Sequence, residues 1–526
     1  MDRLLERVVR EFLRKEGLST GYLSFLASRS LFVRLVVVTT CMLGRGTQRV
    51  WPFSLVGKFL LANALLFEAE VAPQPENVDD GRPDLKFAEA FYDVVVVGSG
   101  PGGSVSALRH AQAGKRVLVI EEGPDIPTSS IGHHSVRQAV VQLRDSGFQA
   151  IYGRPPVAFA QGRTVGGGSE VNSGLYHRVP DPYRSMLLSA VGASERQWSD
   201  LETRVEEKLC VQKAPQSHLK GSQLASRGFV QGSLKLGLTV EEVPRWRTYN
   251  PETHQGMKNT YLNSFLEEGG ELVSGYRVLR VFERDTEVMV QVQSPNSRIL
   301  VRCDEVVVSA GSLETVRILK NSGLVRKTIF PFNFHPMVRL LAEYSAPVND
   351  GGHFPPFQSW TADKTTKFGF SVSTFAYLKA FYAALRGVEP RMETLPKLLA
   401  YFGSFTLQDS KSFVVVFARR VYCWIFWGPK DRRKTSETEN LLRDVLNAGG
   451  AQETIGGSGD PSISTVHLFG SIPIGSSKLI DERGKLAGSS RVFVCDSALL
   501  PVAPWVNPQG PVMVLCELVT ERKLAG

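Results

Sequence analysis

A glycine-rich segment at residues 98–103 has a spacing that could hold a phosphate group. Gly98, Gly100 and Gly103 form a G-x-G-x-x-G pattern, which allows a tight turn, a close approach of a pyrophosphate and close helix packing. Glu121 follows about 20 residues later, where an acid can accept hydrogen bonds from ribose hydroxyls. We expect this first glycine loop to bind a dinucleotide rather than to form an ordinary glycine-rich turn.

A second glycine loop spans residues 162–174 and reads Gly-Arg-Thr-Val-Gly-Gly-Gly-Ser-Glu-Val-Asn-Ser-Gly. Its glycines and small polar residues cannot build a hydrophobic core, but they let the backbone lie against a flat or anionic ligand. A surface loop is the alternative interpretation of these residues alone.

His467 is the residue whose type is best suited to proton transfer, because the pKa of imidazole lies near working pH. It lies in an apolar run, however, where a histidine is more often a hydrogen-bonded core residue. His335, in Asn-Phe-His-Pro, is interpreted as structural.

The segments around these residues predict an α/β fold. Four consecutive valines at 94–97 are typical of a parallel strand that is buried on both faces. The expected elements are strands at 92–97 and 117–120 with a helix at 104–113, a strand pair at 299–310 with a helix at 312–321, and a strand at 492–496 with a helix at 511–523. Two intervening stretches differ in character, and the aromatic alternation of 368–382 and 413–417 suggests antiparallel strands.

These observations predict a discontinuous nucleotide-binding domain with a substrate domain inserted into it. The expected segments are a helical cap at 1–85, nucleotide-binding parts at 86–175, 256–335 and 461–526, and substrate-domain parts at 176–255 and 336–460. The cap is basic and amphipathic, and its apolar runs are too short to span a bilayer. It could touch a membrane surface or be a purely soluble extension.

Bulk composition excludes several classes of function. The net charge of +9 is spread without a long basic run, which disfavours nucleic acid as a partner. The six scattered cysteines contain no C-x-x-C pair, so they indicate neither a metal site nor a dithiol motif. Such cysteines suggest a reducing compartment, and we expect a cytoplasmic protein with an optional peripheral membrane contact.

The order of the motifs resembles the glucose–methanol–choline (GMC) family of flavin oxidoreductases. The resemblance covers residues 90–526 and includes both glycine loops and the Val-Val-Ser-Ala-Gly-Ser-Leu-Glu-Thr run at 307–315. It also includes His-Leu-Phe-Gly-Ser at 467–471, the segment at 494–501 and Val-Asn-Pro at 506–508. It implies a Rossmann-like FAD-binding domain, an antiparallel-sheet substrate domain and FAD bound non-covalently.

The resemblance also implies roles for individual residues. His467 would be the base that takes a hydroxyl proton, and Asn507 would hold the substrate oxygen. The residues implied in FAD binding are Gly98, Gly100, Gly103, Glu121, Arg163, Gly166, Gly167, Ser169, Asn172, Val278, Gly311, Asp496 and Pro508.

The expected reaction is therefore oxidation of an alcohol, with O₂ or another oxidant as the electron acceptor. Aromatic density in the substrate domain, and a loose similarity of 367–405 to long-chain alcohol oxidases, favour a lipophilic substrate. Two alternatives are a flavoenzyme with other chemistry on this fold, such as a lyase or photodecarboxylase, and a non-catalytic, membrane-associated flavin-binding protein.

Overall fold

The computed structural model describes residues 86–526, except 128–129, 148, 182, 214–215, 247–254, 295–296, 352–356 and 458–462. The helical cap expected at 1–85 lies outside the described residues. No helix in the described part of the chain has the length and apolar character needed to cross a membrane.

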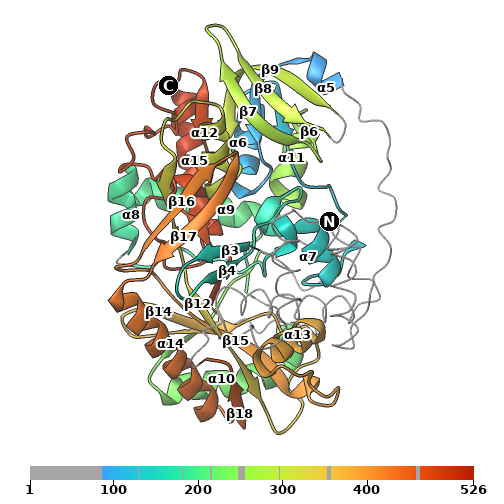
Figure 1. Ribbon diagram of the computed structural model, residues 1–526, viewed down its shortest axis with the longest axis vertical. Helices are drawn as coiled ribbons and strands as arrows, with labels where there is room; N and C mark the ends of the chain where they lie inside the picture. Colours follow the sequence, from blue (N-terminus) through green and yellow to red (C-terminus); the bar gives the residue numbers. More distant parts are fainter. Residues whose placement is uncertain are drawn as a thin grey trace.

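Seven strands in the described part of the chain form a sheet in the upper half of the view in Figure 1. Strand β1 (Phe91–Val97) pairs in parallel with β2 (Val117–Ile120) and β9 (Arg298–Val308). Strand β6 (Glu271–Val273) extends the parallel part beyond β2, and β21 (Val492–Val494) extends it beyond β9. The valines of β1 are buried, which agrees with a strand covered on both faces. The predicted α/β fold with a Rossmann-like domain is confirmed.

Strand β9 corrects one prediction, because residues 299–310 were expected to form two strands. It is a single strand of 11 residues. Its first half pairs antiparallel with β8 (Val288–Gln293), which in turn pairs with β7 (Arg277–Glu283), and its second half pairs with β1 and β21. The change of partner occurs along one extended backbone, so no turn residue marks it in the sequence.

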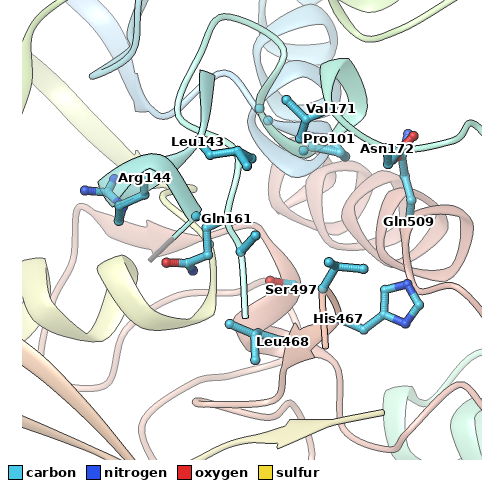
Figure 2. Close-up of a pocket in the computed structure, with 18 of the residues that line it drawn as sticks. Pro101, Leu143, Arg144, Gln161, Val171, Asn172, His467, Leu468, Ser497 and Gln509 are labelled. Atoms are coloured by element: carbon cyan, nitrogen blue, oxygen red, sulfur yellow. The ribbon is translucent and has the colours of Figure 1, made fainter. Parts of the chain in front are cut away.

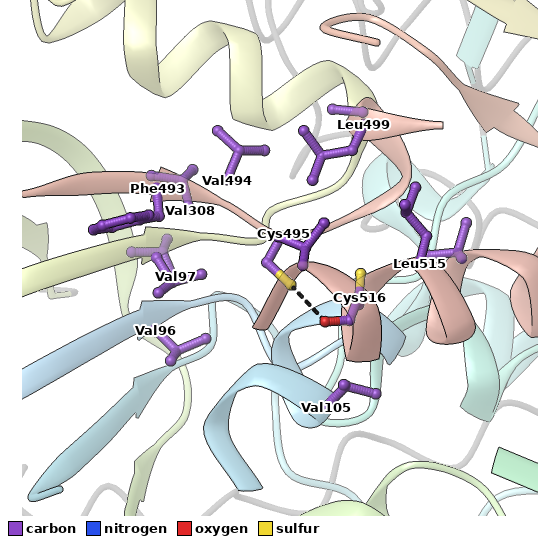
Figure 3. Packing of buried hydrophobic residues seen from close by; sticks show 14 of the residues in the cluster. Val96, Val97, Val105, Val308, Phe493, Val494, Cys495, Leu499, Leu515 and Cys516 are labelled. Carbon is purple, nitrogen blue, oxygen red and sulfur yellow. Dashed lines mark hydrogen bonds between the residues drawn. The ribbon is translucent and has the colours of Figure 1, made fainter. Parts of the chain in front are cut away.

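Helices α6 (Pro101–Gln112) and α15 (Gln509–Ala525) pack against each other beside the parallel strands (Figure 3). Gly102 of α6 lies in a tight space, since a Cβ there would come 3.0 Å from the sulfur of Cys516 on α15 and 2.3 Å from the carbonyl oxygen of Cys495, which follows β21. Cys495 and Cys516 are buried here, and the Cys495 thiol contacts the carbonyl of Cys516 at 3.8 Å.

The second sheet contains twelve strands within the described residues and extends from the middle of Figure 1, where β16, β17, β3 and β4 lie, to the lower part, where β12, β14 and β15 lie. In spatial order the strands are β10 (Ile329–Pro331), β16 (Lys411–Phe417), β17 (Arg420–Phe426), β3 (Gln149–Tyr152), β4 (Val157–Phe159), β19 (Ile463–Thr465), β12 (Met337–Glu343), β15 (Leu398–Phe405), β14 (Thr366–Phe370), β13 (Phe357–Trp360) and β5 (Thr239–Glu242), with β18 (Glu453–Ile455) paired to β12. Most neighbours are antiparallel, as predicted. Strands β3 and β4 belong to this sheet, although residues 86–175 were expected to form part of the nucleotide-binding domain. The boundaries given for the domain segments remain a prediction.

Helices α10 (Gln216–Lys235) and α14 (Pro429–Ala448) cover this sheet, and apolar residues of α10, β12, β14 and α14 form its core. The alternation expected to continue through residues 375–382 is wrong, because that segment is helix α13 (Phe375–Arg386). Thr374 caps the helix by accepting a hydrogen bond from the backbone N–H of Tyr377, and Gly387 ends it in the left-handed region.

The remaining elements are short or connect the two sheets. They are α5 (Lys86–Glu89), α7 (Val136–Gln142), η3 (Arg144–Gly147), η4 (Gly167–Glu170), α8 (Tyr183–Val191), α9 (Glu195–Lys208), η6 (Lys258–Leu262), α11 (Asn263–Glu267), α12 (Ser312–Asn321), β11 (Asn333–Phe334), η7 (Leu395–Lys397), β20 (Leu468–Phe469) and η8 (Ser497–Leu499).

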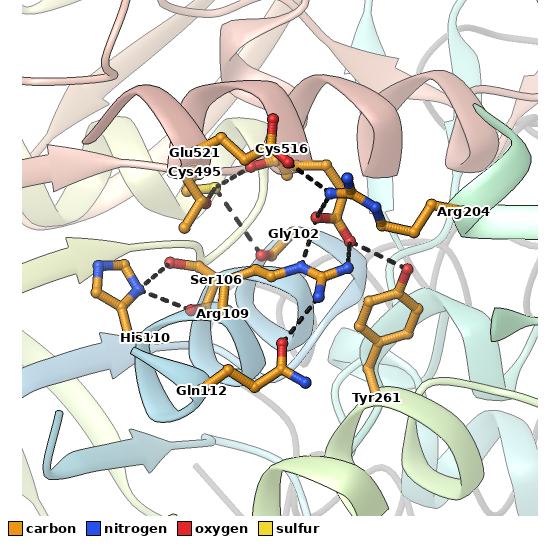
Figure 4. A network of polar contacts seen from close by, with 12 residues as sticks. Gly102, Ser106, Arg109, His110, Gln112, Arg204, Tyr261, Cys495, Cys516 and Glu521 are labelled. Carbon is orange, nitrogen blue, oxygen red and sulfur yellow. Dashed lines mark hydrogen bonds and ion pairs between the residues drawn. The ribbon is translucent and has the colours of Figure 1, made fainter. Parts of the chain in front are cut away.

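A buried ion pair joins α6 to α15 (Figure 4). The Arg109 guanidinium donates two hydrogen bonds to Glu517, at 2.7 and 3.0 Å, and the hydroxyl of Tyr261 donates a third at 3.2 Å. The Glu517 side chain is fully buried, so its charge is stabilised by these donors rather than by water.

We therefore predict that Glu517→Leu lowers the free energy of unfolding by about 3 kcal/mol, because Arg109 would lose its carboxylate partner. Urea denaturation followed by circular dichroism measures the change. The matched control is Glu393→Leu, which breaks the exposed Arg391–Glu393 pair and should change stability by less than about 1 kcal/mol. Equal effects of the two substitutions would contradict a stabilising role for the buried pair.

Candidate active site

A cavity of about 620 Å³ runs between the two sheets. Gly98, Gly100 and Glu121 line one part of it, and His467 and Asn507 line another. In Figure 2, Arg144 and His467 lie on opposite sides of the cavity, and Asn172 and Gln509 lie next to each other. The size is typical of a site for a cofactor or small molecule.

The first glycine loop forms one wall of the cavity. Gly98 has a φ of +99°, and a Cβ there would lie 2.5 Å from the carbonyl oxygen of Ser309, so only glycine fits. A Cβ on Gly103 would lie 2.0 Å from the carbonyl oxygen of Gly98. Gly103 does not line the cavity, and its contact supports the predicted role in helix packing. No side chain caps the N-terminus of α6, so backbone N–H groups remain available to an anion.

The Glu121 carboxylate holds the first glycine loop in place through hydrogen bonds. One carboxylate oxygen accepts hydrogen bonds from the backbone N–H and the hydroxyl of Ser99, at 2.9 and 2.7 Å. The other oxygen accepts from the N–H of Gly123 at 2.8 Å. The residue is buried and lines the cavity. Its role toward a ribose remains a proposal, and its role in shaping the loop follows from these bonds.

The second glycine loop touches the first. Gly167 has a φ of +60°, and a Cβ there would come 2.7 Å from the Cα of Gly100. The N–H of Gly166 donates to the hydroxyl of Ser99 at 3.1 Å. The two loops therefore pack directly against each other. Gly100 and Gly167, at this contact, both line the cavity in which a ligand would bind.

Three predicted residues of the second loop, Arg163, Gly166 and Ser169, do not line the cavity. The Ser169 hydroxyl donates to the carbonyl of Gly166 and accepts from the N–H of Met257, so it holds the loop to a distant segment. The backbone of Arg163 packs closely against Gly123. Asn172 does line the cavity, and its side-chain amide donates to Gln509 at 2.6 Å.

The other predicted cofactor residues also line the cavity. Gly311, with a φ of +82°, precedes α12, and Pro508 precedes α15. Asp496 ties the end of β21 to α12, because it accepts hydrogen bonds from the N–H of Gly311 and the hydroxyl of Thr315. The carbonyl oxygen of Val278 accepts a hydrogen bond from Arg317 at 3.2 Å.

A cluster of charged residues near Val278 was not predicted. The Arg317 guanidinium donates to Glu314 at 2.5 Å, and Arg144 donates two hydrogen bonds to Glu122, at 2.8 and 3.1 Å. Arg277 lies within 3.6 Å of both carboxylates. Burial alone would raise the pKa of Glu314, but the three arginines lower it to about 2. The members of this cluster are far apart in the sequence and are brought together by the fold, so no local pattern predicts the cluster.

A short antiparallel ladder places the histidine at the other end of the cavity. Strand β11 pairs with β20, with Asn333 opposite Phe469 and Phe334 opposite Leu468. His335 follows β11 and His467 precedes β20, and their Nδ1 atoms lie 3.2 Å apart. The ladder therefore brings together a histidine predicted to be a base and one interpreted as structural.

Both imidazoles are held in the neutral form. Burial, with the nearby His335, Lys367, His177 and Arg339, lowers the pKa of His467 well below its usual value. Burial and Lys367 lower the pKa of His335 to about 3. A neutral imidazole can accept a proton, so this environment suits a base.

Lys367, on β14, lies beside the two residues predicted to be catalytic, and sequence reasoning did not single it out. Its Nζ donates to Oδ1 of Asn507 at 2.7 Å, and it lines the cavity with His467. Burial lowers its pKa to about 7, although Glu241 acts in the opposite direction. The one available signal was a lysine in a strand whose neighbours are almost all apolar.

Comparison with known families identifies the same architecture. Two family models, both described as GMC oxidoreductase, match residues 92–338 and 405–516, which is more than half of the 526 residues. Among curated relatives, an uncharacterized GMC-type oxidoreductase of Sinorhizobium fredii is 25% identical over 82% of this chain and 94% of its own. A long-chain-alcohol oxidase of Arabidopsis thaliana is 24% identical over 79% of this chain and 65% of its own.

Solved structures share the fold at low sequence identity. Pyridoxine 4-oxidase from Mesorbium loti has a TM-score of 0.65 and 17% identity, and covers 82% of this chain and 99% of its own. A formate oxidase of Aspergillus oryzae has a TM-score of 0.61 and 13% identity, and covers 82% of this chain and 98% of its own.

The cavity fits FAD, the cofactor implied by the family. The uncapped start of α6 and the contact between Gly167 and Gly100 provide a narrow backbone cradle suited to a pyrophosphate. A buried side-chain oxygen of Gln161 and the amide nitrogen of Gln509 have no hydrogen-bond partner among the described residues. Both residues line the cavity, where a polar ligand would satisfy them.

We predict that Glu121→Gln weakens FAD binding by about tenfold or more. A glutamine amide would present an N–H₂ group to donors that now bind a carboxylate, at a cost of about 1–3 kcal/mol. Fluorescence titration of the apoprotein with FAD measures the dissociation constant. Glu268→Gln, an exposed change outside the cavity, is the control and should leave FAD affinity unchanged. Equal affinity of Glu121→Gln and wild type would contradict the role of Glu121 in shaping the loop.

Proposed function

The chain belongs to the GMC oxidoreductases, and on this basis we propose that it oxidises an alcohol to an aldehyde or ketone with His467 as the base. The protein is an FAD-dependent oxidoreductase of the class that acts on CH–OH groups. FAD, when bound, supplies the acceptor for the hydride that leaves the carbinol carbon. The single observation that carries the proposal is the contact between His467, which lines the cavity, and the buried His335 behind it.

His335 would orient the base. For His467 to accept a proton at Nε2, it must carry its own proton on Nδ1 and donate that proton to Nδ1 of His335, 3.2 Å away. His335 is buried, and His467 is half-buried and lines the cavity, so the base is held from the protein side and open to a substrate on the other. His335 would therefore be a positioning residue, and His467 the group that touches the substrate.

Asn507 would hold the substrate oxygen. Its Oδ1 accepts the hydrogen bond from Lys367, which leaves the Nδ2 hydrogens as donors. A donor at this place would stabilise negative charge that develops on the oxygen as the hydroxyl proton moves to His467. The lysine thus fixes which end of the amide faces the substrate.

The wall near His467 favours an alcohol with an apolar body. Met337, Phe370, Val372, Phe402 and Val466 line this part of the cavity. Similarity to a long-chain-alcohol oxidase supports the same preference. The electron acceptor would be O₂ or another oxidant. The proposed membrane contact depends on residues 1–85, which lie outside the described residues. The proposed cytoplasmic location depends on the cysteine pattern of the sequence.

The two alternatives have less support. A non-catalytic flavin-binding protein would need neither the paired histidines nor the Lys367–Asn507 contact. A lyase or photodecarboxylase shares the fold, but a neutral base beside a hydrogen-bond donor is what alcohol oxidation requires.

We predict that His467→Ala lowers the rate of flavin reduction by about 10²–10⁴-fold, the usual contribution of a positioned base. The measurement is anaerobic bleaching of the oxidised flavin by a panel of fatty, sterol-like, aromatic and sugar alcohols. His133→Gln, which changes a histidine that does not line the cavity, is the control and should keep the wild-type rate. Undiminished reduction in His467→Ala would rule out His467 as the base. Failure of every alcohol to bleach the wild-type flavin would contradict the proposed reaction.

The pH dependence of kcat/KM gives a separate test. Because the pKa of His467 is lowered, the ring stays neutral as the pH falls, and the acid limb should lie below the ordinary histidine value of 6.5. His335→Ala removes one of the groups that lower this pKa, so the limb should move toward higher pH. An acid limb at or above pH 6.5 in the wild type would contradict the assignment.

A further inference from the structure

Lys367 is a buried cation at the chemical end of the cavity. Its side chain belongs to β14 of the larger sheet, and the residue is 4% exposed. The ammonium lies 5.5 Å from the ring centre of Trp360 and 5.9 Å from that of Phe402, so aromatic faces surround it in place of water.

The protein supplies this cation with little negative charge. Among the described residues, the hydrogen-bond partner of Nζ is the neutral amide of Asn507, and no carboxylate forms an ion pair with it. Glu241 acts on Lys367 only from a distance, and its carboxylate accepts a hydrogen bond from Trp360. An ammonium has three donors, and burying a charge without an anion is costly.

A second cation lines the same end of the cavity. Arg339, on β12, donates to the hydroxyl of Tyr377 at 2.6 Å, and its charge acts on His467 together with that of Lys367. The carboxylates that line the cavity within the described residues are Glu121, Glu122, Glu314 and Asp496. Each of them already binds donors around the glycine loops, the charged cluster or α12, and none forms an ion pair with Lys367.

We propose that the substrate is an alcohol that also carries a carboxylate, and that Lys367, assisted by Arg339, binds this anion beside Asn507. The inference rests on the proposed alcohol oxidation and names its substrate class, a hydroxy acid with an apolar body. The carboxylate binds and does not react, and the hydroxyl of the same molecule faces His467.

The lowered pKa of Lys367 agrees with such a role. At a pKa of about 7 the ammonium and the amine are both populated near neutral pH in the absence of an anion. A carboxylate close to Nζ favours the charged form, so substrate binding would complete the ion pair. Phe402 and Phe370, which line the cavity, would pack against the apolar body.

The first experiment needs no variant. Purified holoenzyme is titrated with decanoate and with decanamide, which have the same chain and differ in charge, and binding is followed by the change in flavin absorbance. Neither compound has a hydroxyl group, so binding is measured without turnover. We expect decanoate to bind about tenfold or more tightly, because charge-assisted hydrogen bonds are stronger than neutral ones. Equal or tighter binding of decanamide would overturn the proposal.

Variants then locate the anion site. Lys367→Met should weaken decanoate about 10–100-fold and change decanamide by less than about threefold, since only the charged contact is lost. Lys367→Arg keeps the charge and should retain the preference for decanoate. Lys411→Met, an exposed lysine on β16 of the same sheet, is the matched control for net charge and should change neither affinity.

The outcomes separate this proposal from its rivals. If Lys367→Met weakens both ligands equally, Lys367 acts through Asn507 or the cofactor and not on an anion, which overturns the proposal. Because Lys367 contacts Asn507, the hydroxyl and the carboxylate of the substrate must be close together. Anaerobic reduction by 2-hydroxydecanoic acid and by decan-2-ol then tests the substrate class, with a lower KM expected for the hydroxy acid. Tight decanoate binding without reduction by any alcohol would leave the anion site standing and refute the proposed oxidation.

Discussion

The close contact between two glycine loops is the constraint on which the rest of the structure depends. Gly98 lies against the carbonyl of Ser309, and Gly167 lies against Gly100, at distances that a Cβ would not permit. Ser99 adds polar links to Glu121 and Gly166. Because the contacts between the two loops are made by backbone atoms and the small side chain of Ser99, the cavity remains open for a ligand that the same backbone can bind.

The opposite end of the cavity is built on a different principle. Its polar groups come from elements that meet only in the folded chain: the β11–β20 ladder, strand β14 and the segment before α15. Here buried rings and strands exclude water, so charges act strongly on one another and on the two histidines. Close glycine contacts determine the shape of the cavity at the end proposed for the cofactor. Charged side chains shielded from water determine the electrostatic environment at the end proposed for the reaction.

These two principles explain what could be predicted from sequence. The first loop, β2 and α12 follow from local spacing, and both elements were expected at the residues where they occur. The glycine spacing alone predicts a dinucleotide, and the resemblance to the GMC family specifies that the dinucleotide is FAD. The pairing of His335 with His467 and the burial of Lys367 depend on contacts over 100 residues apart, which leave no local pattern. Helix α13 was missed because its aromatic spacing also fits alternation.

The ion pair between α6 and α15 has a consequence for biosynthesis. Arg109 and Glu517 are 408 residues apart in the chain. At translation rates of about 5–20 residues per second, on the order of tens of seconds separate the synthesis of the two partners. The first glycine loop therefore emerges from the ribosome long before the helix that packs against it. Cofactor capture must wait for late translation, and the nascent chain is exposed to chaperones in the meantime.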